Sequence, residues 1–505
     1  INTANMSIVG GTSQLSSSES AFNEWSGWGA NYYNNRWAQQ NTAVSSSSIQ
    51  SLTSHCTISY PIGLSATPVI SGDAVYYPTW NGSFVALDYL RCQILWEINV
   101  TAIIASYSPI TALQMDLMHP VSRTSPQVDG DIIFFGTLAN ALLVAVNRLT
   151  GEALGMVQVN PHPVAVVTMS PTLYNGKIFI GSSSYEANAT PLPGYVCCTF
   201  VGNFAAFTFD PLTSKFQVLW NITMIPEAQA AMGWAGAGVW GSQPAIDAAR
   251  GQVFIGTGNT YSIPEVIIAC QNITQNISAV LKGYISDSCL PLSVWQESVM
   301  AIDIDLGVIN WIHQLSPLDA FVAACGVPGI FPKNPVVCPH IEGPDADFGM
   351  APAFVPGSRS TPQGKDTLVI GQKNGNLYAM SAETGYLFWT TTTSPNGDEG
   401  GLSWGIAVDD SLVYFTAINS QEKTFQLYPS NQMHNRSAYG ATSLSDGTIL
   451  WTVAMTGNVV NVLELDSNFH GGVAVQGDYV FCGTGYSFLS SGLPNGSLNV
   501  MRVQG

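Results

Sequence analysis

Four charged residues fall in or next to the turns that end repeated sequence units, in a chain where charge is scarce. Only 10% of the 505 residues are charged, against about a quarter in a typical soluble domain. The four are Arg123, Glu186, Asp319 and Lys373. The turn residues Asn259 and Trp240 add an amide and an indole. If these six side chains converge, they would suit a flat polyanion together with a metal ion, because carboxylate and amide oxygens bind hard cations and cationic side chains bind carboxylates.

Each of these residues also has an ordinary structural explanation. Glu186 could be a solvated loop carboxylate, and Asn259, which follows Thr-Gly, could be a plain turn residue. Asp319 follows Ser-Pro and could cap a helix or a turn. Trp240 could pack inside the core. The acidic turn "PDADF" could bind a cation through Asp345 and Asp347, but acidic turns are common.

The adjacent Cys197 and Cys198 in "GYVCCTF" raise a separate question. Neighbouring Cα atoms lie about 3.8 Å apart, which is shorter than the roughly 4.4–6.8 Å of an ordinary disulfide. A bond between these sulfurs would strain the local backbone, and such strain often lies at ligand sites. Two thiols on a strand are the alternative.

The composition excludes several classes of partner. The formal charge of −18, with only 15 Lys plus Arg, argues against nucleic acid and anionic membrane surfaces. No apolar run reaches the ~18 residues that a membrane span requires. The histidines show no metal-ligand spacing, and the chain contains no G-x-S-x-G motif, phosphate-binding loop or C-x-x-C-H haem motif.

The sequence has features of a secreted glycoprotein. It begins at Ile1 without a leader, so we expect a signal peptide to have been removed. Acceptor motifs for N-linked glycans are numerous and occur at Asn5, Asn81, Asn99, Asn188, Asn221, Asn272, Asn276, Asn435 and Asn495. We therefore expect an extracellular or cell-wall location, where disulfides form. The proposed pairs are Cys197–Cys198, Cys270–Cys289, Cys325–Cys338 and Cys56–Cys92, with Cys482 left over on an apolar strand.

A repeated unit runs through the whole chain. The segment 66–96, "ATPVISGDAVYYPTWNGSFVALDYLRCQILW", contains strand-like runs separated by glycine turns and ends at a tryptophan. Similar units begin near residues 124, 170, 242, 367, 405 and 472. The alternation in "FVALD", "LVAVN" and "LYAMS" has the period of two that is typical of strands.

Seven such units predict an all-β protein, a β-propeller of seven four-stranded blades in a single domain, 1–505. The tryptophans at equivalent positions, Trp96, Trp220, Trp311, Trp389 and Trp451, are interpreted as packing between blades. The last unit lacks its final strand, which the segment 25–38, "WSGWGANYYNNRWA", could supply. Insertions interrupt the units at 184–202, 260–297, 312–348 and 420–437, and we expect them to carry a binding site.

The string "AMSAETGYLFW" resembles the tryptophan-docking repeat of the alcohol dehydrogenases that depend on pyrroloquinoline quinone (PQQ). The likeness is greater to the polyvinyl-alcohol-dehydrogenase-like branch of that family and covers most of the chain from Trp25 onward. The matching strings, in order along the chain, include "VSRTSPQVDGD", "GSSSYE", "CCTFVGNF", "VWGSQPAID", "FIGTGNTYS", "HQLSPLDAF", "PDADFG" and "QKNGNLYAM".

The resemblance implies a role for each candidate residue. Glu186 and Asn259 would hold Ca²⁺ beside the quinone. Asp319 would be the catalytic base that takes the proton of the substrate hydroxyl. Three residues would contact PQQ: Arg123 and Lys373 its oxygens, and Trp240 its ring. Vicinal cysteines also occur in the cofactor pocket of this superfamily, which would place the disulfide Cys197–Cys198 at the pocket rim.

Two departures from the family keep a second hypothesis open. Family members close eight blades, whereas here the blade expected between about Val453 and His470 is missing, and Phe321 stands where relatives usually have Trp. The first hypothesis is a secreted alcohol dehydrogenase that uses PQQ and Ca²⁺. The second is a propeller without catalysis that binds another planar molecule such as a pigment, or a metal ion alone.

Overall fold

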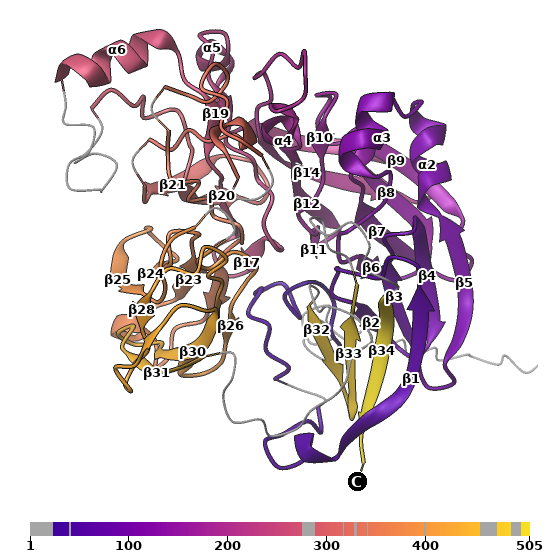
Figure 1. Ribbon diagram of the computed structural model, residues 1–505. Helices are drawn as coiled ribbons and strands as arrows, with labels where there is room; N and C mark the ends of the chain where they lie inside the picture. The colour runs from indigo at the N-terminus through magenta and orange to yellow at the C-terminus, as the bar shows by residue number, and fades with distance from the viewer. Residues whose placement is uncertain are drawn as a thin grey trace, which may run out of the picture.

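The seven sequence units form seven antiparallel four-stranded sheets. The computed structural model describes residues 24–39, 42–274, 288–316, 318–327, 331–340, 342–397, 400–454, 472–485 and 496–504. In Figure 1 the colour runs around a ring of sheets, so that the last strands of the chain lie next to the first. The all-β, seven-bladed propeller predicted from the repeats is confirmed.

Blades 1 to 4 follow the chain order, and their strands have the following bounds. Blade 1 contains β2 (Val69–Ser71), β3 (Ala74–Pro78), β4 (Ser83–Asp88) and β5 (Gln93–Asn99). Blade 2 contains β6 (Gln127–Asp129), β7 (Ile132–Gly136), β8 (Leu142–Asn147) and β9 (Ala153–Gln158). Blade 3 contains β11 (Thr172–Tyr174), β12 (Lys177–Gly181), β14 (Asn203–Asp210) and β15 (Lys215–Thr223). Blade 4 contains β17 (Ala245–Asp247), β18 (Gln252–Gly256), β20 (Ser298–Asp303) and β21 (Ile309–Gln314).

Blades 5 to 7 complete the ring. Blade 5 contains β22 (Ala353–Val355), β23 (Thr367–Gly371), β24 (Asn376–Ser381) and β25 (Leu387–Thr392). Blade 6 contains β26 (Ala407–Val408), β27 (Leu412–Ala417), β30 (Ala438–Ser443) and β31 (Ile449–Ala454). Blade 7 contains β32 (Val473–Gln476), β33 (Tyr479–Gly483), β34 (Gly496–Val503) and, from the other end of the chain, β1 (Leu52–Tyr60).

The final strand of blade 7 is β1 and not the segment 25–38 suggested by the sequence. β1 pairs antiparallel with β34 from Leu52↔Val503 to Tyr60↔Gly496. The disulfide Cys56–Cys92 joins β1 to the turn between β4 and β5 of blade 1. The segment 25–38 cannot form a regular strand because three of its non-glycine residues, Ala30, Asn34 and Arg36, have positive φ.

This N-terminal segment instead lies against the first strands of the blades. The first strands of neighbouring blades contact one another in several pairs, so they surround the propeller axis. Residues 25–35 contact the first strands of blades 1 to 6 in turn. The contacts are Ile70 N–H to Trp25 O, Gln127 Nε2 to Ser26 O, the Tyr32–Tyr174 ring pair, Ile246 N–H to Tyr32 O, Phe354 N–H to Tyr33 O and Val408 N–H to Asn35 O.

Blade-to-blade contact follows one repeated pattern. The indole N–H of Trp311 in blade 4 donates to Ala382 O in blade 5 (3.1 Å), and its ring lies against Gly385, three residues further on. Trp96, Trp220 and Trp389 make the same pair of contacts with the turns of the following blades. For these four tryptophans, the predicted packing between blades is confirmed.

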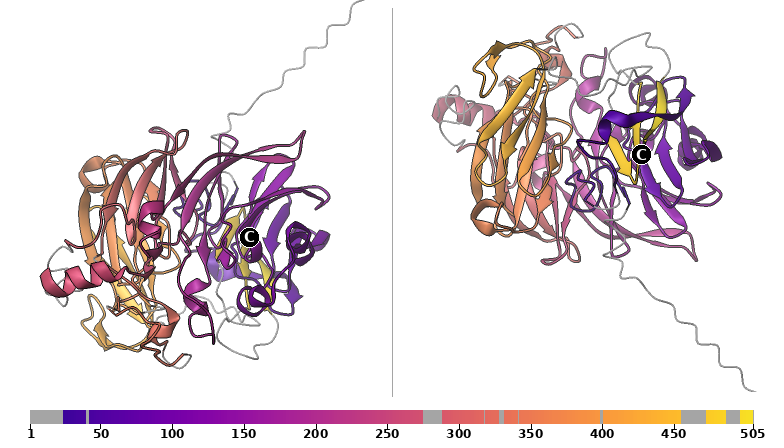
Figure 2. Two further views of the ribbon diagram at one scale, coloured as in Figure 1. Left: turned by 90° about the horizontal axis from the view of Figure 1, so that it is seen from above. Right: turned by 90° about the horizontal axis from the view of Figure 1, so that it is seen from below.

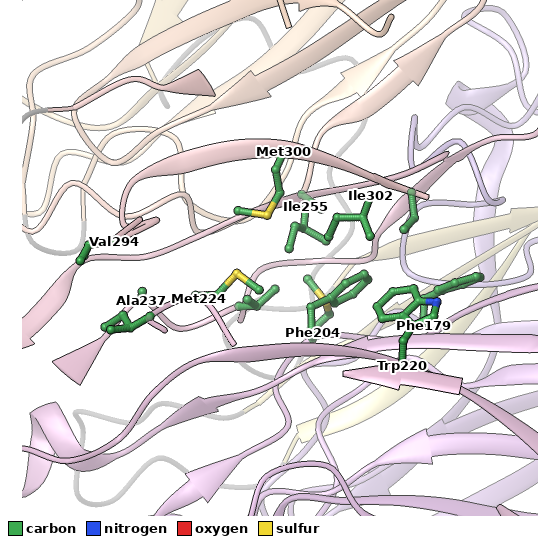
Figure 3. Close-up of a cluster of buried hydrophobic side chains, with 14 of the residues drawn as sticks. Phe179, Phe204, Trp220, Met224, Ala237, Ile255, Val294, Met300 and Ile302 are labelled. Atoms are coloured by element: carbon green, nitrogen blue, oxygen red, sulfur yellow. The ribbon is translucent and has the colours of Figure 1, made fainter. Parts of the chain in front are cut away.

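Aliphatic and aromatic side chains fill the space between blades. Figure 3 shows one such interface, where Phe204 and Trp220 of blade 3 face Ile255 and Met300 of blade 4. All four side chains are buried. Because each blade buries its faces only against its neighbours, the ring must close for the core to be complete.

Short helices and small ribbons lie in the connections. The helices are α2 (Val100–Tyr107), α3 (Ala112–Met118), α4 (Glu186–Ala189), α5 (Glu227–Ala230) and α6 (Glu265–Thr274), all along the upper side of Figure 1. In both views of Figure 2, α6 lies at the periphery of the molecule. The two-stranded ribbons are β10 (Ala165–Val166) with β13 (Ser183–Ser184), β16 (Ala235–Gly236) with β19 (Thr260–Ser262), and β28 (Phe425–Gln426) with β29 (Met433–His434).

No helix in the described part of the chain is long and apolar enough to cross a membrane.

All four predicted disulfides form. They are Cys56–Cys92, Cys197–Cys198, Cys270–Cys289 and Cys325–Cys338. Cys482 is buried in β33 and takes no part in a disulfide.

We predict that Gly385→Ala destabilises the propeller more than Gly176→Ala does. Both glycines have nearly the same positive φ, 71° and 70°, so both variants carry the same backbone strain of roughly 1–2 kcal/mol. A Cβ on Gly385 would lie 2.6 Å from the ring of Trp311, whereas one on Gly176 meets nothing within 4 Å. Overpacking should add about 1–3 kcal/mol. Urea unfolding of the two variants measures the difference, and equal losses of stability would contradict the docking role.

Candidate active site

Arg123, Trp240 and Lys373, which the sequence predicted to contact a cofactor, come together with Trp404, which it did not predict. The rings of Trp240 and Trp404 meet edge to face, with centroids 5.7 Å apart and an interplanar angle of 74°. Arg123 Cζ lies 5.5 Å from the ring centroid of Trp404, and Lys373 Nζ lies 5.5 Å from that of Trp240. Two cations therefore stand against two indole faces, a geometry that favours cation–π attraction.

These side chains are carried by connections of four different blades. Arg123 precedes β6, Trp240 precedes β17, Lys373 follows β23 and Trp404 precedes β26. The ring of Trp240 lies close to Gly349, where an added Cβ would come within 2.8 Å of it. Since the blades fix their connecting loops around one axis, residues up to 281 positions apart meet here.

Lys373 is buried and lies between two carboxylates. Its Nζ is 3.1 Å from Asp345 Oδ2 and 2.9 Å from Asp347 Oδ2. Burial alone would lower the pKa of Lys373, but the two carboxylates outweigh it and raise that pKa. The turn "PDADF", which the sequence offered as a cation site, therefore binds the ammonium group of this lysine.

Asp319 joins the same cluster through the backbone of that turn. Its Oδ1 accepts the N–H of Asp345 at 3.2 Å and its Oδ2 accepts the N–H of Ala346 at 2.6 Å. Burial raises the pKa of Asp319 to about 7 and the charge of Asp347 adds to the effect, although the N–H donors and Lys373 oppose it. A carboxylate that titrates near neutral pH is suited to act as a general base.

A fourth carboxylate, Glu297, was not singled out in the sequence. It is completely buried directly before β20; its Oε2 accepts from Gln372 Nε2 at 2.5 Å, and its Oε1 has no hydrogen-bond partner among the described residues. Burial, with the charges of Asp319 and Asp347, raises the pKa of Glu297 well above its usual value. The described cluster thus holds four carboxyl groups and one ammonium group, and protons must balance part of the charge.

Three hydrogen bonds hold Asn259 in place and leave its side-chain oxygen without a described donor. Its backbone N–H donates to Asp347 Oδ1 at 2.6 Å, and its Nδ2 donates to Thr260 O and Phe321 O at 3.0 and 2.8 Å. These bonds fix the amide plane. No hydrogen bond between described residues uses its Oδ1.

The carboxylate of Glu186 binds backbone N–H groups of the 199–200 segment and not the cluster around Lys373. Its carboxylate accepts the N–H groups of Thr199 and Phe200 at 2.8–3.0 Å and lies 3.5 Å from His162 Nε2. Burial would raise the pKa of Glu186, but His162 and these N–H donors lower it. The bonds anchor the loop directly after Cys197–Cys198.

No ready-made metal cage is found at this site in the described residues. Groups of three His, Cys, Asp or Glu side chains with close ligand atoms are His55–Cys56–Cys92 and Cys325–Cys338–Glu342, and each includes a disulfide. Trp240, Arg123 and Lys373 are residue types that could bind a planar anion. Of the two predicted metal ligands, Asn259 has a side-chain oxygen that accepts no hydrogen bond from a described residue, whereas the carboxylate of Glu186 is occupied.

Comparisons with known proteins agree with this architecture. No family model matches the chain. A polyvinylalcohol dehydrogenase from a Pseudomonas species is 28% identical over 403 residues, which are 77% of this chain and 54% of that protein. The chain thus spans about half the length of this curated relative. A quinohemoprotein alcohol dehydrogenase from Comamonas testosteroni has a TM-score of 0.58 at 12% identity, over 95% of this chain and 80% of that chain. A europium-containing methanol dehydrogenase has a TM-score of 0.57 at 16% identity, over 91% and 82%.

The fold is similar to those of the quinohemoprotein alcohol dehydrogenase and the methanol dehydrogenase. The sequence is similar to polyvinylalcohol dehydrogenases. The resemblance noted in the sequence is confirmed.

Sequence reasoning missed Trp404, Glu297 and the pairing of Lys373. Trp404, in "GLSWGIAV", follows a cluster of glycines just before a predicted strand, the same position that drew attention to Trp240 in "VWGSQPAID". Glu297 carried no comparable signal, because it is the last residue of the insertion 260–297 and matches no recognised motif.

We predict that the free energy of unfolding falls as pH rises from about 4 to about 7, and that Asp319→Asn makes this decline smaller. In the unfolded chain, Asp319 should lose its proton near the ordinary value of about 3.9, whereas the folded protein holds it until about pH 7. The contribution of Asp319 to the free energy of unfolding is therefore fully present below pH 4 and is lost as pH rises through 7.

Urea unfolding of chelator-treated protein at pH 4.5, 5.5, 6.5 and 7.5 measures this slope. The exposed Asp210, whose pKa is lowered by hydrogen bonds from Thr213 and Leu212, serves as the control. Asp210→Asn should leave the decline in place. A decline identical in wild type and Asp319→Asn would contradict the assignment.

Proposed function

We propose that the chain is a quinoprotein-type alcohol dehydrogenase whose planar cofactor, PQQ, binds at the Trp240–Trp404 pair. The observation that carries the proposal is the meeting of Arg123, Lys373 and Trp240 next to a buried Asp319 with a pKa near 7. PQQ is planar and bears several carboxylates, so an aromatic surface with cations on two sides suits it. The similarity to polyvinylalcohol dehydrogenases supports an alcohol as the substrate class.

Asp319 would act as the base. The two N–H groups of the 345–347 turn hold its carboxylate in place, so its orientation does not depend on a flexible partner. When bound, PQQ would supply the acceptor for the hydride of the alcohol carbon. Burial, together with the charge of Asp347, keeps the proton affinity of Asp319 high enough to take the hydroxyl proton at neutral pH.

The vicinal disulfide would lie at the rim of the cofactor pocket. Cys197 and Cys198 pack against the cluster that includes Phe200, Phe321 and Ala324. Phe321 lies two residues beyond Asp319, and Phe200 donates its N–H to Glu186. This packing connects the cysteine loop with the segment that carries the base, so the disulfide would cover one side of the site.

Ca²⁺ would bind beside the cofactor through Asn259 and Glu186. Asn259 offers its Oδ1 without rearrangement, whereas Glu186 must exchange its bonds to Thr199 and Phe200 for the ion. Metal binding would therefore move the loop that carries Cys197 and Cys198.

The engagement of Glu186 also favours a second candidate function. If its carboxylate stays with Thr199 and Phe200, the pocket can bind a planar anion without metal-assisted oxidation. The propeller would then be a binding protein for another flat molecule, such as a pigment.

One experiment separates the two functions. Purified protein is incubated with PQQ, with or without Ca²⁺, and assayed with primary alcohols, secondary alcohols and polyvinyl alcohol using an artificial electron acceptor. The enzyme hypothesis predicts Ca²⁺-dependent turnover that Asp319→Asn lowers by at least about 100-fold while PQQ binding remains. The exposed Asp305→Asn is the control, because Asp305 pairs only with Lys177 on the described surface. Binding of PQQ without turnover would favour the second function, and no binding would contradict both the quinone site and the enzyme.

We also propose that the protein is secreted and glycosylated. Four disulfides favour an oxidising compartment. Four of the acceptor asparagines are exposed: Asn81, Asn99, Asn221 and Asn435. The side chains of Asn99 and Asn221 accept hydrogen bonds through the amide oxygen, which leaves the amide nitrogen available for a glycan. Asn188 is half-buried in α4.

We therefore expect glycans at the four exposed asparagines and none at Asn188. Peptide mass spectrometry of protein from a eukaryotic secretory host, before and after enzymatic deglycosylation, tests this expectation. A glycan at Asn188 with unmodified Asn81 and Asn221 would contradict the assignment from exposure.

A further inference from the structure

Trp404 is the more exposed of the two tryptophans at the candidate site and lies in a glycine-rich connection. It lies in the connection between β25 and β26, where Gly397, Gly400, Gly401 and Gly405 supply little side-chain packing. The Trp404 side chain is 46% exposed. Its ring contacts Trp240 at one edge and Arg123 on one face.

Arg36 of the N-terminal segment holds this connection from the other side. Its Nη2 donates to Trp404 O at 2.9 Å. Its guanidinium packs flat against Gly405, where an added Cβ would lie 2.8 Å from Arg36 Cζ. The same guanidinium lies over the ring of Trp28, 4.7 Å from the centroid.

The backbone of Arg36 is itself fixed. Its N–H donates to Gly29 O at 3.0 Å, and the preceding Asn35 O accepts the N–H of Val408 in β26. Arg36 also has a φ of 53°, a conformation that costs a non-glycine residue about 1 kcal/mol or more. Surrounding contacts must therefore impose this conformation.

Ion pairing does not explain why an arginine is present. None of the salt bridges between described residues includes Arg36, although the chain has 33 acidic residues. Burial lowers its pKa to about 10, which still leaves it charged at neutral pH. The planar guanidinium of Arg36 stacks on Trp28 and at the same time donates a hydrogen bond to Trp404 O. A lysine cannot make both contacts with the same geometry.

We infer that Arg36 is a positioning residue which sets the place of Trp404, and that the N-terminal segment thereby controls how tightly the pocket binds a planar ligand. The binding part of this inference rests on the proposed function. The positioning part concerns the ligand-free protein and can be tested separately.

The first experiment follows Trp404 without any ligand. The full chain is labelled with 5-fluorotryptophan, and its ¹⁹F resonance is assigned with Trp404→Phe. In Arg36→Lys and Arg36→Met, the Trp404 resonance should shift or broaden while those of Trp96, Trp220 and Trp311 stay in place. An unchanged Trp404 resonance in both variants would overturn the inference.

Arg502→Lys is the matched control. Arg502 also lies over an aromatic ring, 5.2 Å from the centroid of Tyr479, but it lies in β34 of blade 7. This variant should leave the Trp404 resonance unchanged. If it moved Trp404 as much as Arg36→Lys does, the effect would be a general consequence of losing an arginine, and the inference would fail.

The second experiment measures PQQ affinity by quenching of tryptophan fluorescence. Arg36→Lys should weaken binding roughly five- to seventyfold, the range of one lost cation–π contact and one hydrogen bond. If the protein turns over alcohols, the cofactor concentration for half-maximal activity should rise while the rate at saturation stays near that of wild type. Unchanged affinity in a variant whose Trp404 has moved would refute the control of binding.

The outcomes distinguish this inference from the proposed function. If wild-type protein does not bind PQQ, the proposed function fails, while the ¹⁹F result still decides whether Arg36 positions Trp404. A thermal unfolding curve for each variant identifies any that fails to fold, and Arg36→Lys and Arg36→Met provide two independent replacements.

Discussion

The structure depends on one repeated contact, an indole of one blade placed on the glycine turn of the next. The contact joins a hydrogen bond to an apolar surface, and only a residue without a Cβ allows the ring to approach at positive φ. It fixes each blade relative to its neighbour in the same way at Trp96, Trp220, Trp311 and Trp389. Among the described residues this contact occurs at four of the seven blade interfaces, and there it sets the relative positions of the loops that connect the blades.

A ring held in this way can place charges where an isolated loop could not. Asp319, Asp345, Asp347 and Glu297 are buried with a single described ammonium group among them. Burying like charges together is unfavourable, and the cluster responds by holding protons and by pairing with Lys373. Burial and the charge of Asp347 raise the pKa of Asp319 to about 7, which is the property that the proposed base requires. The burial of these acidic groups therefore underlies both the ion pairs of Lys373 and the proposed role of Asp319.

The N-terminal segment has two roles that the repeat does not require. Residues 52–60 complete blade 7, so that β1 and β34, from opposite ends of the sequence, pair in one sheet. Residues 25–36 run across the first strands of six blades and end at Arg36, under the connection that carries Trp404. A segment that looked like a closing strand instead lies across the first strands of six blades, because its asparagines and its residues of positive φ suit turns better than a pleated strand.

The sequence by itself predicted the all-β class, the seven units, the docking tryptophans, plausible disulfide pairs and most residues of the candidate site, because local periodicity and motifs shared with a known family indicate these features. It could not determine which side chains meet. Lys373 pairs with Asp345 and Asp347, Glu186 turns to the N–H groups of Thr199 and Phe200, and Arg36 reaches Trp404 across 368 positions. Such contacts depend on how far each loop turns about the axis and on which partner offsets the cost of burying a charge. Only the closed ring decides both, since it brings loops from different blades to one place.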